Sequence, residues 1–366
     1  MRIVIIADSV DLQNAGIHVY TRSMIEALQT YTSHEIICIR QGKRQDIHFE
    51  NDVTVKPALW LLEKDPLRVF WSMPRAIKKL KPDCVIEPAH FGPFNLPPHI
   101  KRVTIIHDLT PLAFPQWHHT FSSTLQKWFL PFILKKASMV VPNSKNTLND
   151  LHQYFPQIRS KSEWVYPGIN PYYRIPEDGL LVEKQPYFLS VGTIEPRKNL
   201  VCLLKAYALF RKNSQHNHRL ILVGPKGWKS DKFYQQLEEH PYRNDIEIKG
   251  YVSQNELRDL YGKASAFIYP SFYEGFGFPV AEAMACGAPC IVSSSSSLPE
   301  VGGDAVLYFN PESPDELSQK MQQLVNDKTL CKTLIEKGYR QAQKFSWTEF
   351  ASSFDTKVLQ NIKKDK

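Results

Sequence analysis

Short apolar runs alternate with patterns of helical spacing through the first half of the chain. The apolar runs, each predicted to be a buried strand, are Arg2–Ala7, Glu35–Ile39, Cys84–Glu87, Val103–Ile106 and Met139–Val141. Between Ile17 and Leu28 the apolar residues recur at the three- and four-residue spacing of a helix. Strands that alternate with helices predict a parallel sheet with helices on both faces, the α/β class. Ligands of such sheets bind at the carboxyl ends of the strands.

A second unit of the same kind is expected after residue 170. A length of 366 residues favours two domains over one. Proline, glycine and charged residues accumulate over Val165–Pro186, where the apolar periodicity stops, and this is typical of a linker. A new apolar run, Tyr187–Gly192, then precedes a pattern of helical spacing over residues 200–210. The chain therefore predicts two α/β domains.

The stretch Tyr269–Gly287, YPSFYEGFGFPVAEAMACG, has the order strand end, glycine-containing loop and helix. Pro279 suits the first turn of that helix and Gly287 suits its end. Backbone N–H groups at a helix start can bind phosphate, and the carboxylates of Glu274 and Glu282 can accept hydrogen bonds from hydroxyls. The pattern favours a ligand that is part sugar and part phosphate. The alternative is a turn whose glycines only satisfy backbone geometry and whose glutamates are solvated.

Other polar residues also fall where a predicted strand ends. Arg197 and Lys198 follow the first strand of the second domain, where two adjacent cations can hold a diphosphate or simply be surface charge. His107 follows a strand of the first domain, a position that fits a functional or a structural histidine equally. Gly16 opens a helix, and it either admits a sugar phosphate or is a plain helix-entry glycine.

Three motifs carry a resemblance that covers essentially the whole chain. EGFGFPVAEAMACGAPC, in which seven residues separate Glu274 from Glu282, resembles the signature of retaining glycosyltransferases of the glycogen-synthase-like group, glycosyltransferase family 4. GTIEPRKNL and HDLTPL resemble segments of the same family. The resemblance implies a GT-B fold, two Rossmann-like domains with parallel sheets that face each other across a cleft. It implies an acceptor-binding domain at 1–170, a nucleotide-sugar-binding domain at 171–345, and a C-terminal helix at 346–366 that crosses back to the first domain.

The resemblance also implies residue roles. Glu274 would contact hydroxyls of the transferred sugar and His107 would lie near its anomeric carbon, so these two are the expected catalytic residues. Glu282 would bind the nucleotide ribose. The expected donor-binding residues are Gly16, Arg197, Lys198, Gly275, Phe276, Gly277 and Glu282. Independently of the resemblance, the serine run at 293–297 is expected to form a ligand-facing loop, because it offers many small donors.

The implied activity is retaining transfer of a hexose to an alcohol. HDLTPL and SLPEVGGDA resemble bacterial mannosyltransferases of surface polysaccharide assembly. This predicts GDP-mannose as the donor, and a saccharide or lipid-linked saccharide as the acceptor in lipopolysaccharide biosynthesis. UDP-glucose or dTDP-rhamnose is the alternative donor. A nucleotide-sugar epimerase or hydrolase on the same fold, and a non-catalytic sugar- or membrane-binding module, are the alternative functions.

The net charge of +8, concentrated in residues 1–170, is compatible with an anionic partner. Leu59–Lys81 combines aromatic with basic residues and favours an anionic membrane surface. The members of this stretch are Trp60, Phe70, Trp71, Arg68, Arg75, Lys78, Lys79 and Lys81. In Trp128–Lys136, WFLPFILKK, the apolar residues are expected in the core, with the lysines solvated, and contact with an anionic membrane surface is the alternative. A nucleic-acid partner is not expected, because no recognised module is present.

The expected location is the cytoplasm, with peripheral attachment at the inner face of the cell membrane. The apolar start MRIVIIAD is too short for a signal peptide, and no apolar run approaches the roughly 18 residues of a membrane span. Six scattered cysteines without a CxxC pair suit a reducing compartment. The chain has neither a P-loop nor an Asp-x-Asp motif. No metal and no cofactor beyond the nucleotide-sugar donor are therefore expected.

Overall fold

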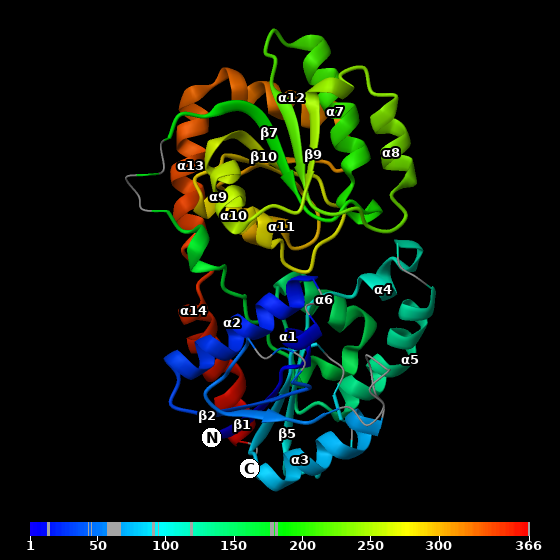
Figure 1. Ribbon diagram of the computed structural model, residues 1–366, viewed down its shortest axis with the longest axis vertical. Helices are drawn as coiled ribbons and strands as arrows, with labels where there is room; N and C mark the ends of the chain where they lie inside the picture. The colour runs from blue at the N-terminus through cyan, green and yellow to red at the C-terminus, as the bar shows by residue number, and fades with distance from the viewer. Residues whose placement is uncertain are drawn as a thin grey trace. The chain divides into compact units, whose positions relative to one another are not determined.

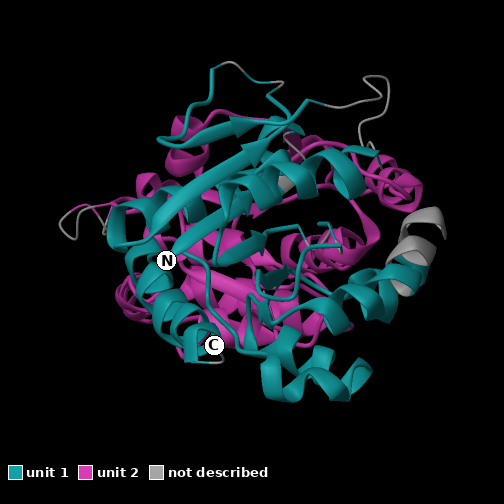
Figure 2. Cartoon of the chain, turned by 90° about the horizontal axis from the view of Figure 1, so that it is seen from below, with its two compact units in different colours: residues 1–168, 346–366 teal, residues 169–345 magenta. Residues whose placement is uncertain are grey.

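The computed structural model describes residues 1–12, 15–42, 44, 46–56, 67–89, 92–93, 95–117, 120–175, 179 and 182–364. It divides into two compact units, which Figure 2 colours separately. The first unit comprises Met1–Gly168 and Ser346–Lys366, and the second comprises Ile169–Phe345. The chain thus passes into the second unit slightly before the expected boundary at 170/171, and its last segment lies with the first unit.

The first unit is built on a six-stranded sheet (Figure 1). Its strands are β1 (Arg2–Ile6), β2 (Glu35–Arg40), β3 (Asp52–Thr54), β4 (Cys84–Glu87), β5 (Lys101–Ile106) and β6 (Met139–Pro142). Every neighbouring pair is parallel, and the order across the sheet is β3-β2-β1-β4-β5-β6. A parallel sheet is covered on both faces, which explains why a strand such as β1, RIVII, is a continuous apolar run.

Helices of the first unit cover this sheet. They are α1 (Asp8–Leu12), α2 (Ala15–Tyr31), α3 (Met73–Leu80), α4 (Thr110–Ala113), α5 (Thr120–Lys136), α6 (Lys145–Tyr154), α14 (Trp347–Phe354) and α15 (Gln360–Lys364). The C-terminal segment is attached through α14, which packs on α2, with the rings of Tyr20 and Trp347 5.7 Å apart. Ser346 caps α14 by accepting a hydrogen bond from the backbone N–H of Glu349.

The second unit repeats the architecture with a second six-stranded parallel sheet. Its strands are β7 (Gln185–Val191), β8 (Arg219–Val223), β9 (Ile246–Gly250), β10 (Ala264–Tyr269), β11 (Cys290–Ser293) and β12 (Leu307–Phe309). Figure 1 shows one group of helices on each side of this sheet. One group is α7 (Leu200–Asn213), α8 (Asp231–Glu238) and α12 (Pro314–Asn326); the other is α9 (Gln254–Lys263), α10 (Phe278–Ala285) and α13 (Lys328–Ala342).

Both sheets have the same strand order when each is numbered from its own first strand. The order in the second unit is β12-β11-β10-β7-β8-β9, which is the 3-2-1-4-5-6 order of the Rossmann fold, as in the first unit. In this order the chain reverses its direction across the sheet between the first and fourth strands. Those strands are β1 and β4 in the first unit, and β7 and β10 in the second. Ligands of doubly wound sheets bind outside the carboxyl ends of these two strands.

The aromatic residues of α5 do not lie where the sequence predicted. Trp128 is 69% exposed and Phe132 is 63% exposed, and Phe129 is also exposed. On the opposite side of the helix, Leu130, Ile133 and Leu134 are buried. Of these, Leu130 and Leu134 pack in the hydrophobic cluster between α5, α6 and β6. The expectation that the aromatic residues of this stretch are core residues is therefore wrong, because the helix has two apolar faces and the sheet covers one. Of the helices in the described ranges, none is both long and apolar enough to cross a membrane.

The other aromatic and basic stretch is only partly at the surface. Trp60 lies outside the described residues. Phe70 and Trp71 are exposed, and the Arg75 guanidinium lies 4.3 Å from the centre of the Trp71 ring. Arg68, by contrast, is buried and forms an ion pair with Asp8. Assigning Arg68 to a membrane surface was wrong, because its charge is used inside the unit.

Candidate active site

Two cations and a carboxylate meet at the carboxyl ends of β7 and β10. Arg197 and Lys198 lie in a short 3-10 turn that follows β7, and Glu274 lies in the loop that follows β10. The Glu274 carboxylate bridges the cations: Oε2 is 2.6 Å from Arg197 Nη1, and Oε1 is 2.7 Å from Lys198 Nζ. The cluster therefore stands where a doubly wound sheet presents its ligand.

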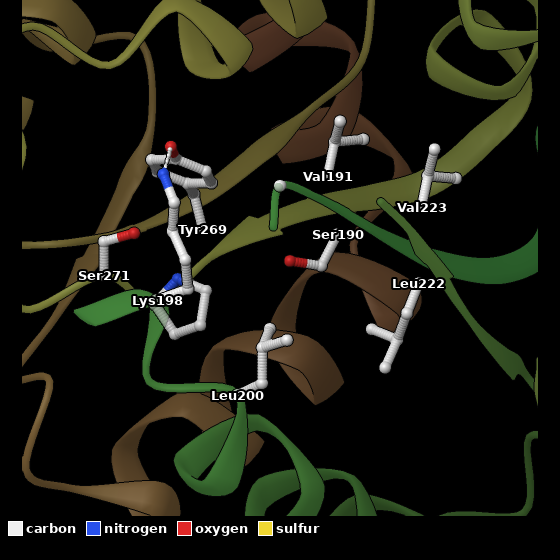
Figure 3. A pocket seen from close by; sticks show the side chains of 10 residues that line it. Ser190, Val191, Lys198, Leu200, Leu222, Val223, Tyr269 and Ser271 are labelled. Carbon is white, nitrogen blue, oxygen red and sulfur yellow. Dashed lines mark hydrogen bonds between the residues drawn. The ribbon is translucent and has the colours of Figure 1, made fainter. Parts of the chain in front are cut away.

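The charge state of Glu274 follows from these contacts. Burial alone would favour the neutral acid, but Arg197 and Lys198 oppose it and hold the pKa of Glu274 at about 2. The side chain is therefore a carboxylate at neutral pH. The Lys198 ammonium also donates to the hydroxyl of Tyr269, at 2.7 Å, as Figure 3 shows.

A second carboxylate holds the far edge of the Arg197 guanidinium. Glu195 Oε1 accepts hydrogen bonds from Arg197 Nη2 at 2.7 Å and from Nε at 3.1 Å. Its side chain is 2% exposed, and burial raises its pKa while Arg197 and Lys198 oppose the rise. The sequence analysis did not select Glu195. The available signal was its place two residues before Arg197 in the strand-to-helix connection.

Lys198 also lines a small cavity, whose lining side chains Figure 3 shows. The cavity has a volume of about 10 Å³, roughly the space of one water molecule. Its lining comes from the ends of β7, β8 and β10 and includes Ser190, Leu222 and Ser271. The ammonium of Lys198, whose side chain lines this cavity, donates to Tyr269 and Glu274.

Hydrogen bonds from the serine run at 293–297 hold the backbone of the loop after β10. Ser297 Oγ donates to the carbonyl oxygens of Glu274 and Phe276, at 2.9 and 2.8 Å, and the Glu274 N–H donates to Ser296 Oγ. Ser293 and Ser297 are buried. The Ser293 hydroxyl donates to the Ser271 carbonyl oxygen at 2.5 Å. For Ser293 and Ser297 the expectation of a ligand-facing serine loop was therefore wrong, because their hydroxyls hold the backbone of the loop after β10.

The residues Gly275, Phe276 and Gly277 connect this loop to α10. Gly277 precedes the helix with a φ of 105°, a backbone conformation that favours glycine. Phe276 is buried, and its ring packs on those of Phe278 and Phe345. Its side chain is therefore a packing residue, and only the backbone of Phe276 is placed to meet a ligand at the start of α10.

Glu282 lies further along α10 and is half-buried. The hydroxyl of Tyr261 donates to its Oε2 at 3.3 Å. Burial raises the pKa of Glu282 to about 7, and the tyrosine hydrogen bond only partly opposes the rise. The side chain is therefore neutral below pH 7 and a carboxylate above it.

If Glu282 accepts hydrogen bonds from the ribose hydroxyls of the donor, donor affinity should depend on pH. A carboxylate is the better acceptor, so the Kd for an intact nucleotide-sugar is expected to fall as the pH rises from 6 to 8. Calorimetric titration with the donor measures this, since both of its phosphates are esterified and lack a proton that titrates near neutral pH. Glu282→Gln should bind the donor more weakly above pH 7 and lose the pH dependence. An unchanged pH dependence in this variant would exclude Glu282 as its origin.

His107 and Gly16 belong to the first unit. His107 follows β5, donates from Nε2 to the Pro88 carbonyl oxygen at 2.8 Å, and packs edge-on against Tyr20 at 4.8 Å. Burial lowers its pKa, so the imidazole is neutral at pH 7 with its proton on Nε2. Gly16 is exposed in the first turn of α2. Apart from its chain neighbours and the backbone of its own helix, no atom of the described residues lies within 4 Å of the position a Cβ atom would take there. Packing within the unit therefore does not require a glycine at this position.

Family models match both units. The model described as "Glycosyltransferase Family 4" matches residues 15–172. The model described as "Glycosyl transferases group 1" matches residues 174–341. The first match lies almost wholly in the first unit, and the second lies wholly within the second unit.

Curated relatives and solved structures agree with these matches. The chain is 35% identical to the O-antigen chain mannosyltransferase B of Escherichia coli over 70% of each chain. It is 30% identical to the O-antigen chain mannosyltransferase RfbU of Salmonella typhimurium, over 59% of this chain and 58% of that one. A sucrose-phosphate synthase from Thermosynechococcus elongatus has the same fold over the full length of both chains, with a TM-score of 0.78 and 18% identity. The chain therefore belongs to the family 4 glycosyltransferases and has their GT-B fold, two Rossmann-like units with parallel sheets.

Proposed function

We propose that this glycosyltransferase transfers mannose from GDP-mannose to a saccharide or lipid-linked saccharide acceptor during O-antigen assembly, with retention of the anomeric configuration. The observation that carries the proposal is the cluster of Arg197, Lys198 and Glu274 at the carboxyl ends of β7 and β10. It offers cations to a diphosphate and a carboxylate to sugar hydroxyls. The choice of mannose rests on the two O-antigen mannosyltransferases to which the chain is similar.

In the proposed reaction, the bond between the anomeric carbon and the diphosphate oxygen breaks. The acceptor oxygen forms its bond to the same face of that carbon, and the acceptor's hydroxyl proton moves to the departing diphosphate. Arg197 and Lys198 stabilise the negative charge that develops on the leaving group. Glu274 and the neutral His107 contact the transferred sugar, and Glu282 contacts the ribose. Gly16 and the backbone of Gly275, Phe276 and Gly277 complete the donor site.

A panel of donors tests this proposal. The purified protein is offered GDP-mannose, UDP-glucose and dTDP-rhamnose, each with free and lipid-linked oligosaccharides, and products are identified by mass spectrometry and NMR. GDP-mannose should support transfer, and the new linkage should have the anomeric configuration of the donor. Turnover with another donor but not with GDP-mannose would refute the donor assignment. Consumption of donor without any acceptor would indicate an epimerase or hydrolase instead.

We also propose that transfer needs no divalent metal. The charge of the leaving diphosphate is met by Arg197 and Lys198, whose side chains are both mostly buried and therefore interact strongly with it. Transfer should keep most of its rate after dialysis against EDTA, with the rate before dialysis as the reference. Loss of activity in EDTA that magnesium or manganese restores would contradict this prediction.

The exposed face of α5 is proposed as the contact with an anionic membrane. Trp128 and Phe132 are exposed on it, Lys135 and Lys136 follow in its last turn, and residues 109–149 contain no Asp or Glu. Aromatic side chains insert at the bilayer interface, and each nearby lysine adds about 1 kcal/mol at an anionic surface. The protein would then meet a lipid-linked acceptor at the inner face of the cell membrane.

Vesicle sedimentation measures this contact. The protein should bind vesicles that contain anionic lipid, and binding should weaken as salt is added. Replacing Trp128 and Phe132 together by alanine should weaken binding about tenfold or more, because both apolar side chains leave the interface. Trp228→Ala, at an exposed tryptophan of the second unit, is the matched control and should bind normally. Equal binding to neutral vesicles, or no binding at all, would contradict the proposal.

A further inference from the structure

We propose that Glu274 is an internal counter-ion that occupies the place of the donor diphosphate in the unliganded protein, and that the diphosphate displaces it on binding. This inference rests on the proposed function, in which Arg197 and Lys198 hold the diphosphate. It assigns Glu274 two successive partners, first the two cations and then the transferred sugar.

The geometry of Glu274 is that of a bridging anion. Each carboxylate oxygen meets one cation, Arg197 Nη1 at 2.6 Å and Lys198 Nζ at 2.7 Å. A diphosphate that binds both cations also needs one oxygen at each of these donors. Arg197 Nη1 also donates to the Tyr273 carbonyl oxygen at 2.9 Å, so its two N–H groups are divided between that oxygen and Glu274. The Lys198 ammonium likewise donates to both Tyr269 and Glu274. A diphosphate oxygen that binds at Nη1 therefore competes with the Glu274 carboxylate.

The second carboxylate is placed differently. Glu195 contacts only the Nε and Nη2 edge of Arg197, away from Nη1. Its buried position in the chain that leads from β7 into α7 keeps it there. Arg197 can therefore exchange the anion bound at Nη1, while its contacts with Glu195 hold the plane of the guanidinium fixed. Glu195 is thus a positioning residue for Arg197, and Glu274 is the residue that exchanges.

The balance of charge supports exchange over simple addition. In the unliganded protein two carboxylates, Glu195 and Glu274, offset the charges of Arg197 and Lys198. A diphosphate that approached this neutral group would meet a fixed anion at its own binding position. When Glu274 leaves the cations, the repulsion is removed and its carboxylate becomes available to sugar hydroxyls. The contact with the transferred sugar would then form only after the diphosphate has bound.

Calorimetric titration with GDP, the product nucleotide without its sugar, tests the exchange. Glu274→Gln keeps the shape of the side chain but removes its charge, so GDP should bind about tenfold or more tightly than to the wild-type protein. Glu195→Gln is the matched control, because it removes one charge from the same cluster without freeing Nη1. It should bind GDP no more tightly than the wild type. Circular dichroism of each variant verifies the fold.

The outcomes separate this inference from the proposed function. Unchanged or weaker GDP binding by Glu274→Gln would overturn the exchange, even if the wild type transfers mannose. Equal tightening by both variants would also overturn it, since a general loss of negative charge would then explain the effect. If the wild type neither transfers a sugar nor binds a nucleoside diphosphate, the proposed function fails and the inference fails with it.

Discussion

Glu274→Ala is expected to lower the rate of sugar transfer by about 100- to 1,000-fold. The substitution removes the carboxylate that is proposed to contact the reacting sugar, and it leaves Arg197 and Lys198 without their shared anion. Steady-state kinetics with saturating donor and acceptor measure the loss. The loop around the residue should persist, because Ser296 and Ser297 hold it through its backbone.

Two controls show whether the lost activity comes from the Glu274 carboxylate itself. Glu312→Ala, at an exposed glutamate of the same unit, is the control and should transfer sugar at the wild-type rate. Thermal unfolding of Glu274→Ala should remain cooperative, which shows that the loss is not one of folding. A variant that lacks the Glu274 carboxylate and still transfers sugar at a near-normal rate would refute the assigned role.

Arg197→Ala and Lys198→Ala should each slow transfer by roughly 30- to 1,000-fold, which corresponds to about 2–4 kcal/mol in the transition state. Each removes a charged hydrogen bond to the leaving diphosphate. Arg197→Lys should not restore activity, because one ammonium cannot contact Glu195 with one edge and the diphosphate with another.

The matched control for both is Lys205→Ala, which removes an exposed cation from α7. It should leave kcat and the donor KM unchanged. If Arg197→Ala and Lys198→Ala bind GDP and transfer sugar as well as Lys205→Ala does, these cations do not stabilise the leaving group.

Much of the fold was predictable because its signals are local. Strands buried on both faces are continuous apolar runs, and helix ends carry their own markers. Ser253, for example, caps α9 by accepting a hydrogen bond from the backbone N–H of Glu256, three residues further on. Gly287 was expected to end α10, and it follows that helix with a φ of 73°.

The burial of side chains on α5 and around Arg68 was not predictable in the same way. The apolar pattern of Trp128–Lys136 does not show which side of the helix meets the sheet, and the structure leaves Trp128 and Phe132 exposed. Arg68 is paired with Asp8, which is distant in sequence. Both outcomes depend on how separate segments pack, and no local pattern contains that information.

The candidate site was predictable in its location but not in its internal contacts. Arg197, Lys198 and Glu274 were all expected at carboxyl ends of strands, and the order of β7 and β10 explains why they meet. Their pairing in the unliganded protein depends on side-chain directions that only the structure gives. The same holds for Glu195, whose importance becomes visible only through its contact with Arg197.

A crystal structure of the protein with GDP tests the central claim most directly. The account predicts phosphate oxygens within hydrogen-bonding distance of Arg197 and Lys198 at the carboxyl ends of β7 and β10, and a Glu274 carboxylate that has left both cations. Glu195 should still hold Arg197. A diphosphate bound elsewhere in the protein, with Arg197 and Lys198 still paired to Glu274, would contradict the account.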